Sequence, residues 1–142
     1  MRTFIRLFVF TLIFAVGLPA AALVAAEEKL PDGFIALSDT KMAWDEAKAW
    51  CEQRGGRLPL IGGSESLGGR APIIETVPTG TPIDGFGARS DPWPPGLPID
   101  YYWTGTADSD YPSYSWIITR DDFVRVNNSP QSDTLRVVCV PK

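Results

Sequence analysis

Histidine is absent from the whole chain of 142 residues. It is the side chain that most often acts as a general base near neutral pH, and it is the commonest protein ligand of transition metals. Its absence excludes the Ser-His-Asp and Cys-His sets that activate a nucleophile. The glycine pairs at residues 62–63 and 68–69 lack the lysine that follows in a phosphate-binding loop. We therefore expect a protein that is not an enzyme and that holds no cofactor.

Basic residues are also scarce. The chain carries 13 Lys and Arg residues against 17 Asp and Glu residues, which gives a formal net charge of −4. Proteins that bind nucleic acid or anionic lipid neutralise phosphate with clusters of Lys and Arg, and this chain has no basic run. We expect neither nucleic acid nor an anionic membrane surface as a partner.

Residues 1–26 differ in composition from the rest of the chain. Arg2 and Arg6 flank the start of an apolar stretch at residues 7–16, and the small residues 24–26 fit the cleavage site of a secretory signal peptide. The alternative is an uncleaved membrane anchor, for which the apolar stretch is short and Pro19 is unfavourable. Cleavage would leave one domain, residues 27–142, that is periplasmic or secreted, has no membrane span and carries 11 basic against 17 acidic residues.

Two cysteines, Cys51 and Cys139, occur in the whole chain. In an exported protein such a pair is expected to form a disulfide bond, and the alternative is two buried free thiols. In the chain-entropy model, closing a loop of this length stabilises the fold by roughly 4–5 kcal/mol. The bond would tie a segment near the start of the domain to its last strand.

A short strand at residues 34–38 and an amphipathic helix beginning near Trp44 open the expected domain. Trp44, Ala47 and Cys51 recur at i, i+3 and i+7, so they share one helix face that points to the core. Gly55 suits the left-handed position that ends a helix. The helix is expected to take its N-cap oxygen from one of three polar residues, Ser38, Asp39 and Thr40.

The middle of the chain, residues 62–98, is rich in glycine and proline and shows no period of either secondary structure. We expect a long loop region with a short helix or strand around residues 71–77. The last third is typical of strands, because it is aromatic and β-branched. The strands are expected at residues 101–106, 114–120, 123–127 and 135–140, with a turn at residues 108–112, the tip of a hairpin at residues 121–122 and a loop at residues 127–133. Together these elements predict an α+β fold, one helix packed on a small antiparallel sheet.

Several short motifs, taken in order, resemble those of bacterial C-type-lectin-like domains, in particular the lectin-like C-terminal domains of collagen-like and invasin-type adhesins. They are Trp-Asp-Glu-Ala-Lys-Ala-Trp-Cys at residues 44–51, Gly-Gly-Arg-Leu-Pro at residues 55–59, Tyr-Trp-Thr-Gly-Thr at residues 102–106, Trp116, and Arg-Val-Val-Cys-Val at residues 136–140. The resemblance covers residues 34–61 and 101–141. It implies the C-type-lectin-like fold, and it implies the pairing of Cys51 with Cys139.

The chain departs from that family where the family binds sugar. Classical members hold calcium with a Glu-Pro-Asn or Gln-Pro-Asp motif and a Trp-Asn-Asp motif, and the calcium ion holds the sugar hydroxyls. Neither motif occurs here, so we do not expect sugar binding of that kind. The Gly-Gly-Arg-Leu-Pro turn also resembles the formylglycine-generating enzymes that share the fold. Those proteins are much longer, and this chain lacks their further cysteines and their tryptophan-rich motif.

Five residues are candidates for ligand contact: Trp93, Trp103, Asp108, Asp110 and Tyr111. Trp93 lies between prolines and either offers an exposed ring or folds back on its own loop. Trp103 faces either the core or the loop. The two aspartates either bind calcium or bond to their own backbone, as turn residues commonly do. The adjacent acids at residues 121–122 are not expected to form an acid/base pair, because neighbours on a tight turn point apart.

These observations favour an exported, non-enzymatic binding module that recognises a protein or a glycan through residues 62–98 and residues 108–114. Because one fold hosts many functions, this function rests on fold analogy. The alternative is a structural or accessory envelope protein whose long loop packs on a larger partner. The sequence leaves the ligand and the oligomeric state open.

Overall fold

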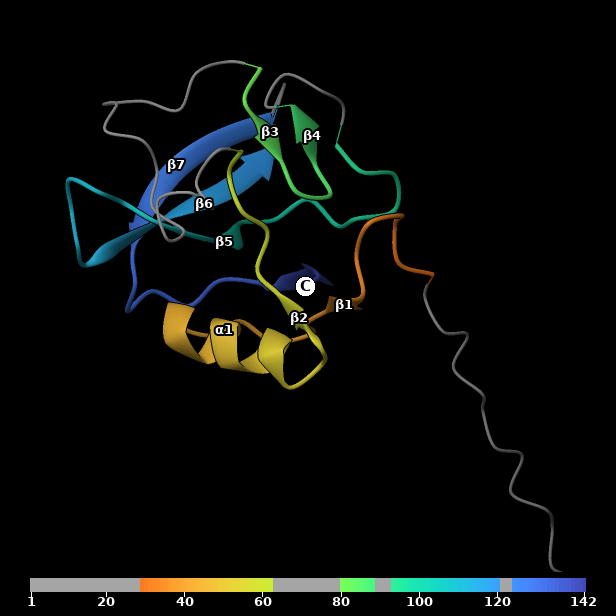
Figure 1. The fold of residues 1–142 in the computed structure, drawn as a ribbon, viewed down its shortest axis with the longest axis horizontal. Coiled ribbons are helices and arrows are strands. Elements are labelled where there is room, and N and C mark those ends of the chain that lie inside the picture. Colours follow the sequence, from red (N-terminus) through yellow and green to blue (C-terminus); the bar gives the residue numbers. More distant parts are fainter. Residues whose placement is uncertain (1–28, 63–79, 89–92, 121–123) are drawn as a thin grey trace, which may run out of the picture.

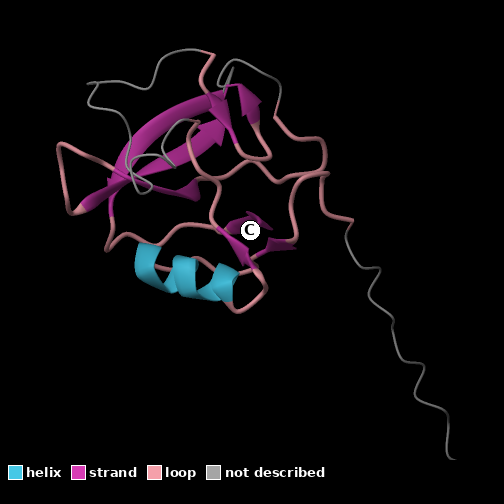
Figure 2. Cartoon of the chain, viewed as in Figure 1, coloured by secondary structure: helices cyan, strands magenta, loops and turns pink. Residues whose placement is uncertain are grey.

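The structure, a computed structural model, describes residues 29–62, 80–88, 93–120 and 124–142. These residues form one helix and three small antiparallel sheets (Figures 1 and 2). This confirms the expected α+β class, whereas the single sheet that was expected is divided into three. The expected signal peptide, residues 1–26, lies outside the described residues. No helix in the described part is long and apolar enough to cross a membrane.

The first sheet joins the two ends of the domain. Strand β8 (Val138–Pro141) lies between β1 (Ala36–Leu37) and β2 (Gly56–Arg57), and it is antiparallel to both. The ladder of β8 is shorter than the strand expected at residues 135–140. The residues just before it still pair, because Leu135 bridges Met42 and Arg136 bridges Tyr102. The C-terminal segment therefore contacts strands from both halves of the chain.

The largest sheet has the order β5-β6-β7, formed by β5 (Tyr102–Ala107), β6 (Tyr114–Arg120) and β7 (Val124–Pro130). This confirms the expected strands, whereas residues 121–123, between β6 and β7, are not described. The expected loop at residues 127–133 is wrong in its first half. Strand β7 continues to Pro130, because Asn127, Asn128 and Ser129 all pair with β6. Backbone pairing overrides the turn preference of these polar side chains.

A hairpin lies inside the expected long loop region. Strands β3 (Pro82–Ile83) and β4 (Gly87–Ala88) pair, with Gly85 and Gly87 in the left-handed region of φ. Ile83 also bridges Ile61 and is buried. The sequence gives little sign of this hairpin, because its strands are only two residues long and are held by contacts to the core. The element expected at residues 71–77 lies outside the described residues.

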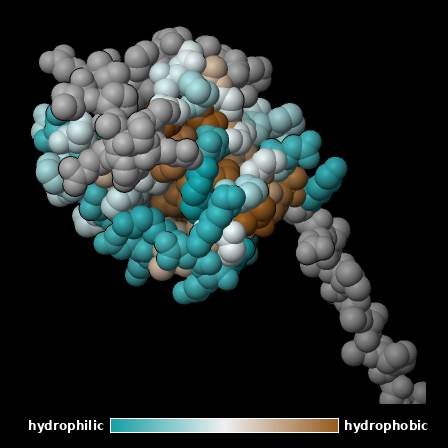
Figure 3. Space-filling model, viewed as in Figure 1, coloured by the Kyte–Doolittle hydropathy of each residue, from teal (hydrophilic) through white to brown (hydrophobic). Residues whose placement is uncertain are grey.

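Helix α1 (Trp44–Glu52) buries the expected face, formed by Trp44, Ala47 and Cys51. Its solvent side is polar, and hydrophilic residues cover the surface where the helix lies (Figure 3). The expected N-cap is wrong. The cap position is Ala43, whose N–H group donates to Glu46 Oε2 at 3.1 Å, because the preceding Met42 still pairs with Leu135. The helix therefore begins beyond the reach of residues 38–40.

Buried side chains form two clusters on opposite faces of the central strands. Tyr102 and Trp103 are neighbours on β5, yet they belong to different clusters, as period-2 alternation requires. Val138 and Cys139 divide in the same way on β8. The helix covers one face, and the described parts of the loop region cover the other. Both faces of β5 are thus buried.

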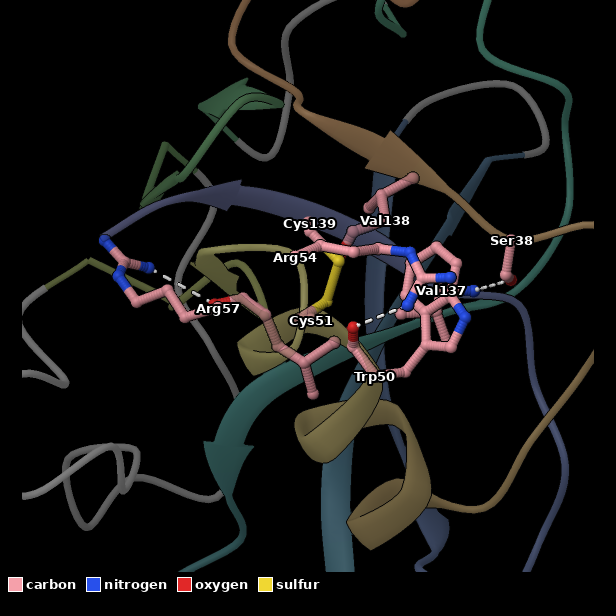
Figure 4. The surroundings of a disulfide bond; sticks show 9 residues. Ser38, Trp50, Cys51, Arg54, Arg57, Val137, Val138 and Cys139 are labelled. Atoms are coloured by element: carbon pink, nitrogen blue, oxygen red, sulfur yellow. Dashed lines mark hydrogen bonds between the residues drawn. A yellow bond between two sulfur atoms is a disulfide. The ribbon is translucent and has the colours of Figure 1, made fainter.

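The disulfide bond lies at the centre of the helix-side cluster (Figure 4). It joins Cys51 of α1 to Cys139 of β8, the Cα atoms are 5.5 Å apart, and both residues are fully buried. This confirms the expected pairing. A residue of the helix is thereby bonded covalently to the strand on which the helix packs.

Replacing both cysteines, Cys51→Ala with Cys139→Ala, is expected to lower the free energy of unfolding by roughly 4–5 kcal/mol, because the open chain regains loop entropy. The bond closes a loop with a sequence separation of 88. Urea denaturation of the variant and of the reduced wild-type protein should give similar midpoints. Alkylation of both cysteines in the unreduced, denatured wild-type protein would contradict the bond.

Tyr102 has a buried ring in the loop-side cluster, and its hydroxyl donates to the Pro98 carbonyl at 2.8 Å. Burial raises the pKa of Tyr102 to about 12; the Arg136 charge partly lowers it and the Asp100 carboxylate adds to the rise. The native state therefore holds the phenolic proton more tightly than the unfolded chain. The stabilisation that depends on this proton is complete below about pH 10 and is lost as the pH rises towards about 12.

The Tyr102→Phe variant should lose less stability than the wild-type protein between about pH 8 and about pH 11, because it carries no proton at this site. At the lower pH the variant itself should be less stable by about 1 kcal/mol, since it lacks the hydrogen bond to Pro98. Urea midpoints measured at both pH values test this. Equal losses in the two proteins would contradict the assigned pKa.

Candidate functional site

The five candidate ligand residues separate into two groups. Trp93 and Trp103 are buried in the two clusters of the core. Asp108, Asp110 and Tyr111 lie together in the connection between β5 and β6, residues 108–114, which we call the 108–114 turn. The structure therefore brings three of the five together and places two elsewhere.

Trp93 folds back on its own loop, which was one of the two alternatives. Its side chain is 5% exposed, and its Nε1–H group donates to the Leu97 carbonyl at 2.8 Å. The ring packs edge-on against Phe86, with centroids 5.2 Å apart, and lies 5.9 Å from the ring of Tyr102. The expectation of an exposed ring at Trp93 is wrong, because these aromatic partners provide a core for it to join.

Trp103 is fully buried on the helix side. Its Nε1–H group donates to the Met42 carbonyl at 2.9 Å, so the indole has no unsatisfied polar atom. Because β5 is covered on both faces, a large side chain on this strand has no solvent-facing side to occupy. The expected ligand contact of Trp103 is therefore wrong, and its side chain belongs to the core.

Asp108 holds the 108–114 turn together from inside. Its side chain is 4% exposed. Oδ1 accepts hydrogen bonds from the backbone N–H groups of Asp110 at 2.9 Å and Tyr111 at 3.2 Å, and Oδ2 accepts one from Asn128 Nδ2 at 2.8 Å. A carboxylate that accepts from two successive N–H groups fixes the local backbone. Of the two alternatives for Asp108, the structure supports bonding to its own backbone.

Asp110 is exposed and offers its carboxylate to solvent. Since both oxygens of its neighbour Asp108 already accept hydrogen bonds, the pair does not present a common set of free oxygens. Within the residues that the structure describes, no group of three or more acidic or cysteine side chains is placed to hold a metal ion.

Gln131, the residue that follows β7, bonds to the end of the turn and to the start of β6. Gln131 Nε2 donates to the Tyr114 carbonyl at 3.2 Å and to Ser115 Oγ at 3.1 Å, and the Gln131 backbone N–H donates to the Ser113 carbonyl at 2.9 Å. Sequence reasoning missed Gln131, as it missed Asn128. Both fall in the segment that was expected to be a loop, and only the register of β6 with β7 brings them to the turn.

Tyr111 projects from this fixed backbone. Its side chain is 59% exposed, and its ring lies edge-on to Tyr114 with centroids 5.8 Å apart. The Tyr114 backbone N–H also donates to the Tyr111 carbonyl at 2.8 Å. The turn therefore presents an aromatic ring whose backbone is fixed and which packs on Tyr114, and the exposed Asp110 precedes it in the chain.

A scan against models of known protein families, a search of curated proteins and a search of solved structures each found no match to this chain.

The Asp108→Ala variant should lower the free energy of unfolding by about 1–3 kcal/mol, because it removes a buried carboxylate that accepts three part-buried hydrogen bonds. Asp110→Ala is the matched control, since that carboxylate is exposed and accepts no hydrogen bond in the described structure. Its stability should stay within about 0.5 kcal/mol of wild type. Equal effects of the two changes in urea denaturation would contradict the assigned role of Asp108.

Proposed function

We propose that this protein is an exported, non-enzymatic binding module of C-type-lectin-like fold, and that it recognises a glycan through Tyr111 in the 108–114 turn. The observation that carries the proposal is the exposed ring of Tyr111 on a backbone fixed by Asp108. An aromatic face stacks on the apolar face of a sugar ring, and a neighbouring carboxylate accepts from sugar hydroxyls. Because the backbone is already ordered, binding costs little conformational entropy.

The fold assignment is supported by the way the ends of the domain are joined. A helix near the start is bonded by a disulfide to the last strand, and that strand pairs with strands from the first half of the domain. The strand that carries Tyr-Trp-Thr-Gly-Thr lies in the core beside them. A disulfide also suits a protein exported to the periplasm or beyond the cell.

Between a glycan and a protein ligand, the 108–114 turn favours the glycan. A specific protein interface buries roughly 800 Å² per partner around several apolar or aromatic anchors. The turn carries a single exposed large hydrophobic side chain, that of Tyr111. Such a small aromatic surface with an adjacent carboxylate matches the size and chemistry of one sugar ring.

A glycan array screened with the labelled protein tests this function. We expect binding to a subset of glycans both with calcium and with a chelator, because the turn presents no set of free oxygens for calcium. Loss of all binding with the chelator would contradict the mechanism. Absence of glycan binding under both conditions would contradict the proposed function and would favour a protein ligand.

For a glycan found in this way, Tyr111→Ala should weaken binding by at least about tenfold, which corresponds to about 1.4 kcal/mol. Its thermal stability should remain that of the wild-type protein, because the ring is mostly exposed. Tyr101→Ala is the matched control, since Tyr101 is 51% exposed but lies outside the turn. Equal weakening by both variants in calorimetric titrations would place the glycan elsewhere.

A further inference from the structure

A cavity of about 580 Å³ lies far along the chain from the 108–114 turn, and it shares no residue with that turn. Its walls come from residues 29–31, from residues 36–40 on and after β1, from Trp50 in the last turn of α1, from Arg54 just after that helix, and from Gly96. The cavity is half open to solvent, and its volume lies in the range of sites that bind small ligands. The proposed function makes no use of it.

Arg54 is held in a defined position on this cavity. Its guanidinium lies 3.7 Å from the centre of the Trp50 ring, and Nη1 donates to the Trp50 carbonyl at 3.0 Å. Figure 4 shows the side chain extended over the indole, on the side of the disulfide where Ser38 also lies. Stacking fixes the plane of the guanidinium and leaves its other N–H groups free to donate, since within the described residues the guanidinium forms no hydrogen bond besides the one to Trp50.

Two of the described cations that form no ion pair lie on this cavity, whereas Arg120, Arg136 and Lys142, which also form none, do not line it. Lys41, Lys48 and Arg57 each pair with an aspartate in the described structure. Lys29 and Arg54 line one cavity, and among the described residues neither forms an ion pair. The chain as a whole is acidic. Two cations without a carboxylate partner beside one cavity favour an anionic ligand, because a ligand anion would supply the missing opposite charge.

The other lining residues indicate which further chemical groups the ligand carries. Asp39 is exposed and contributes the one carboxylate among the described lining residues, and Thr40 contributes a hydroxyl. These groups accept from and donate to hydroxyl groups. Leu30, Pro31 and Leu37 supply apolar surface. With two cations and one carboxylate, the described part of the lining has a single excess positive charge, which matches a monovalent anion better than a phosphate dianion.

We propose that this cavity is a binding site for an acidic sugar, a uronic acid or a similar polyhydroxylated carboxylate. The sugar carboxylate accepts from the guanidinium of Arg54 and the ammonium of Lys29. The ring hydroxyls bond to Asp39 and Thr40, and the C–H face of the sugar packs on the apolar wall. This site is separate from the 108–114 turn, so it goes beyond the proposed function and does not depend on it.

Titration of the ¹⁵N-labelled protein with glucuronate, followed by NMR, tests the proposal. Glucuronate should shift the Trp50 indole N–H and the Arg54 and Thr40 backbone amides, and the affinity should fall as the salt concentration rises. Glucose, N-acetylglutamate and inorganic phosphate should each bind at least about tenfold more weakly, because each lacks either the carboxylate or the sugar ring, or carries the larger charge.

Arg54→Ala should weaken glucuronate binding by at least about tenfold, since it removes the charge-assisted hydrogen bonds to the carboxylate. Lys48→Ala is the matched control: Lys48 lies 3.7 Å over the Trp44 ring on the same helix, but outside the cavity. Tyr111→Ala should leave glucuronate binding unchanged, which separates this site from the proposed glycan site.

Three results would overturn the proposal. They are no shift at Trp50, Arg54 and Thr40 up to high glucuronate concentration, equal binding of glucuronate and any of the three comparison compounds, and equal weakening by Arg54→Ala and Lys48→Ala. Thermal unfolding of each variant shows whether it is folded. A folded Arg54→Lys variant with intermediate affinity would support the proposal, because it keeps the charge and loses the planar, stacked donors.

Discussion

Pairing of the C-terminal segment, residues 135–141, is the constraint on which the rest of the described structure depends. Its carbonyl groups accept hydrogen bonds from the amides of Ile35, Ser38 and Met42 at 2.8–2.9 Å. It therefore fixes the segment that precedes helix α1. Its strand β8 also lies between β1 and β2, and the disulfide bonds it to α1. Non-local pairing of this kind has a high entropic cost, and a covalent bond between the same elements reduces that cost in the unfolded chain.

Joining the ends in this way determines where a ligand can bind. The central strands are covered on both faces, so their aromatic side chains enter the two buried clusters. The side chains that can contact a ligand then lie in the loops between strands and at the ends of helices and strands. Asp108 fixes one such connection, and the last turn of α1 places Arg54 beside a cavity. In both places contacts within the described structure fix a polar or charged side chain, as pre-organised binding requires. Asp108 bonds to its own turn and to Asn128 of β7, and Arg54 stacks on Trp50 of α1.

The sequence predicts well what local periodicity and cysteine pairing determine. The buried face of α1, the left-handed Gly55, the strands β5 and β6 and the disulfide all follow from spacing or residue type. The burial of Trp93 could not be predicted from the sequence. It depends on packing against Phe86 and Tyr102, and the residues next to Trp93 in the chain give no sign of these contacts. The helix start, the β3-β4 hairpin and the full length of β7 likewise depend on pairing with distant segments. For the candidate site, the turn and its residues were predicted, but its braces Asn128 and Gln131 were not.

Hydrogen–deuterium exchange of the backbone amides tests the central role of the C-terminal segment most directly. The account predicts that the amides of Ile35, Ser38 and Met42 are among the best protected in the oxidised protein, because each donates to a carbonyl of residues 135–139. It also predicts that their protection falls when the disulfide is reduced. Rapid exchange at these three amides in the oxidised protein would contradict the account, since the start of the domain would then not be held by its end.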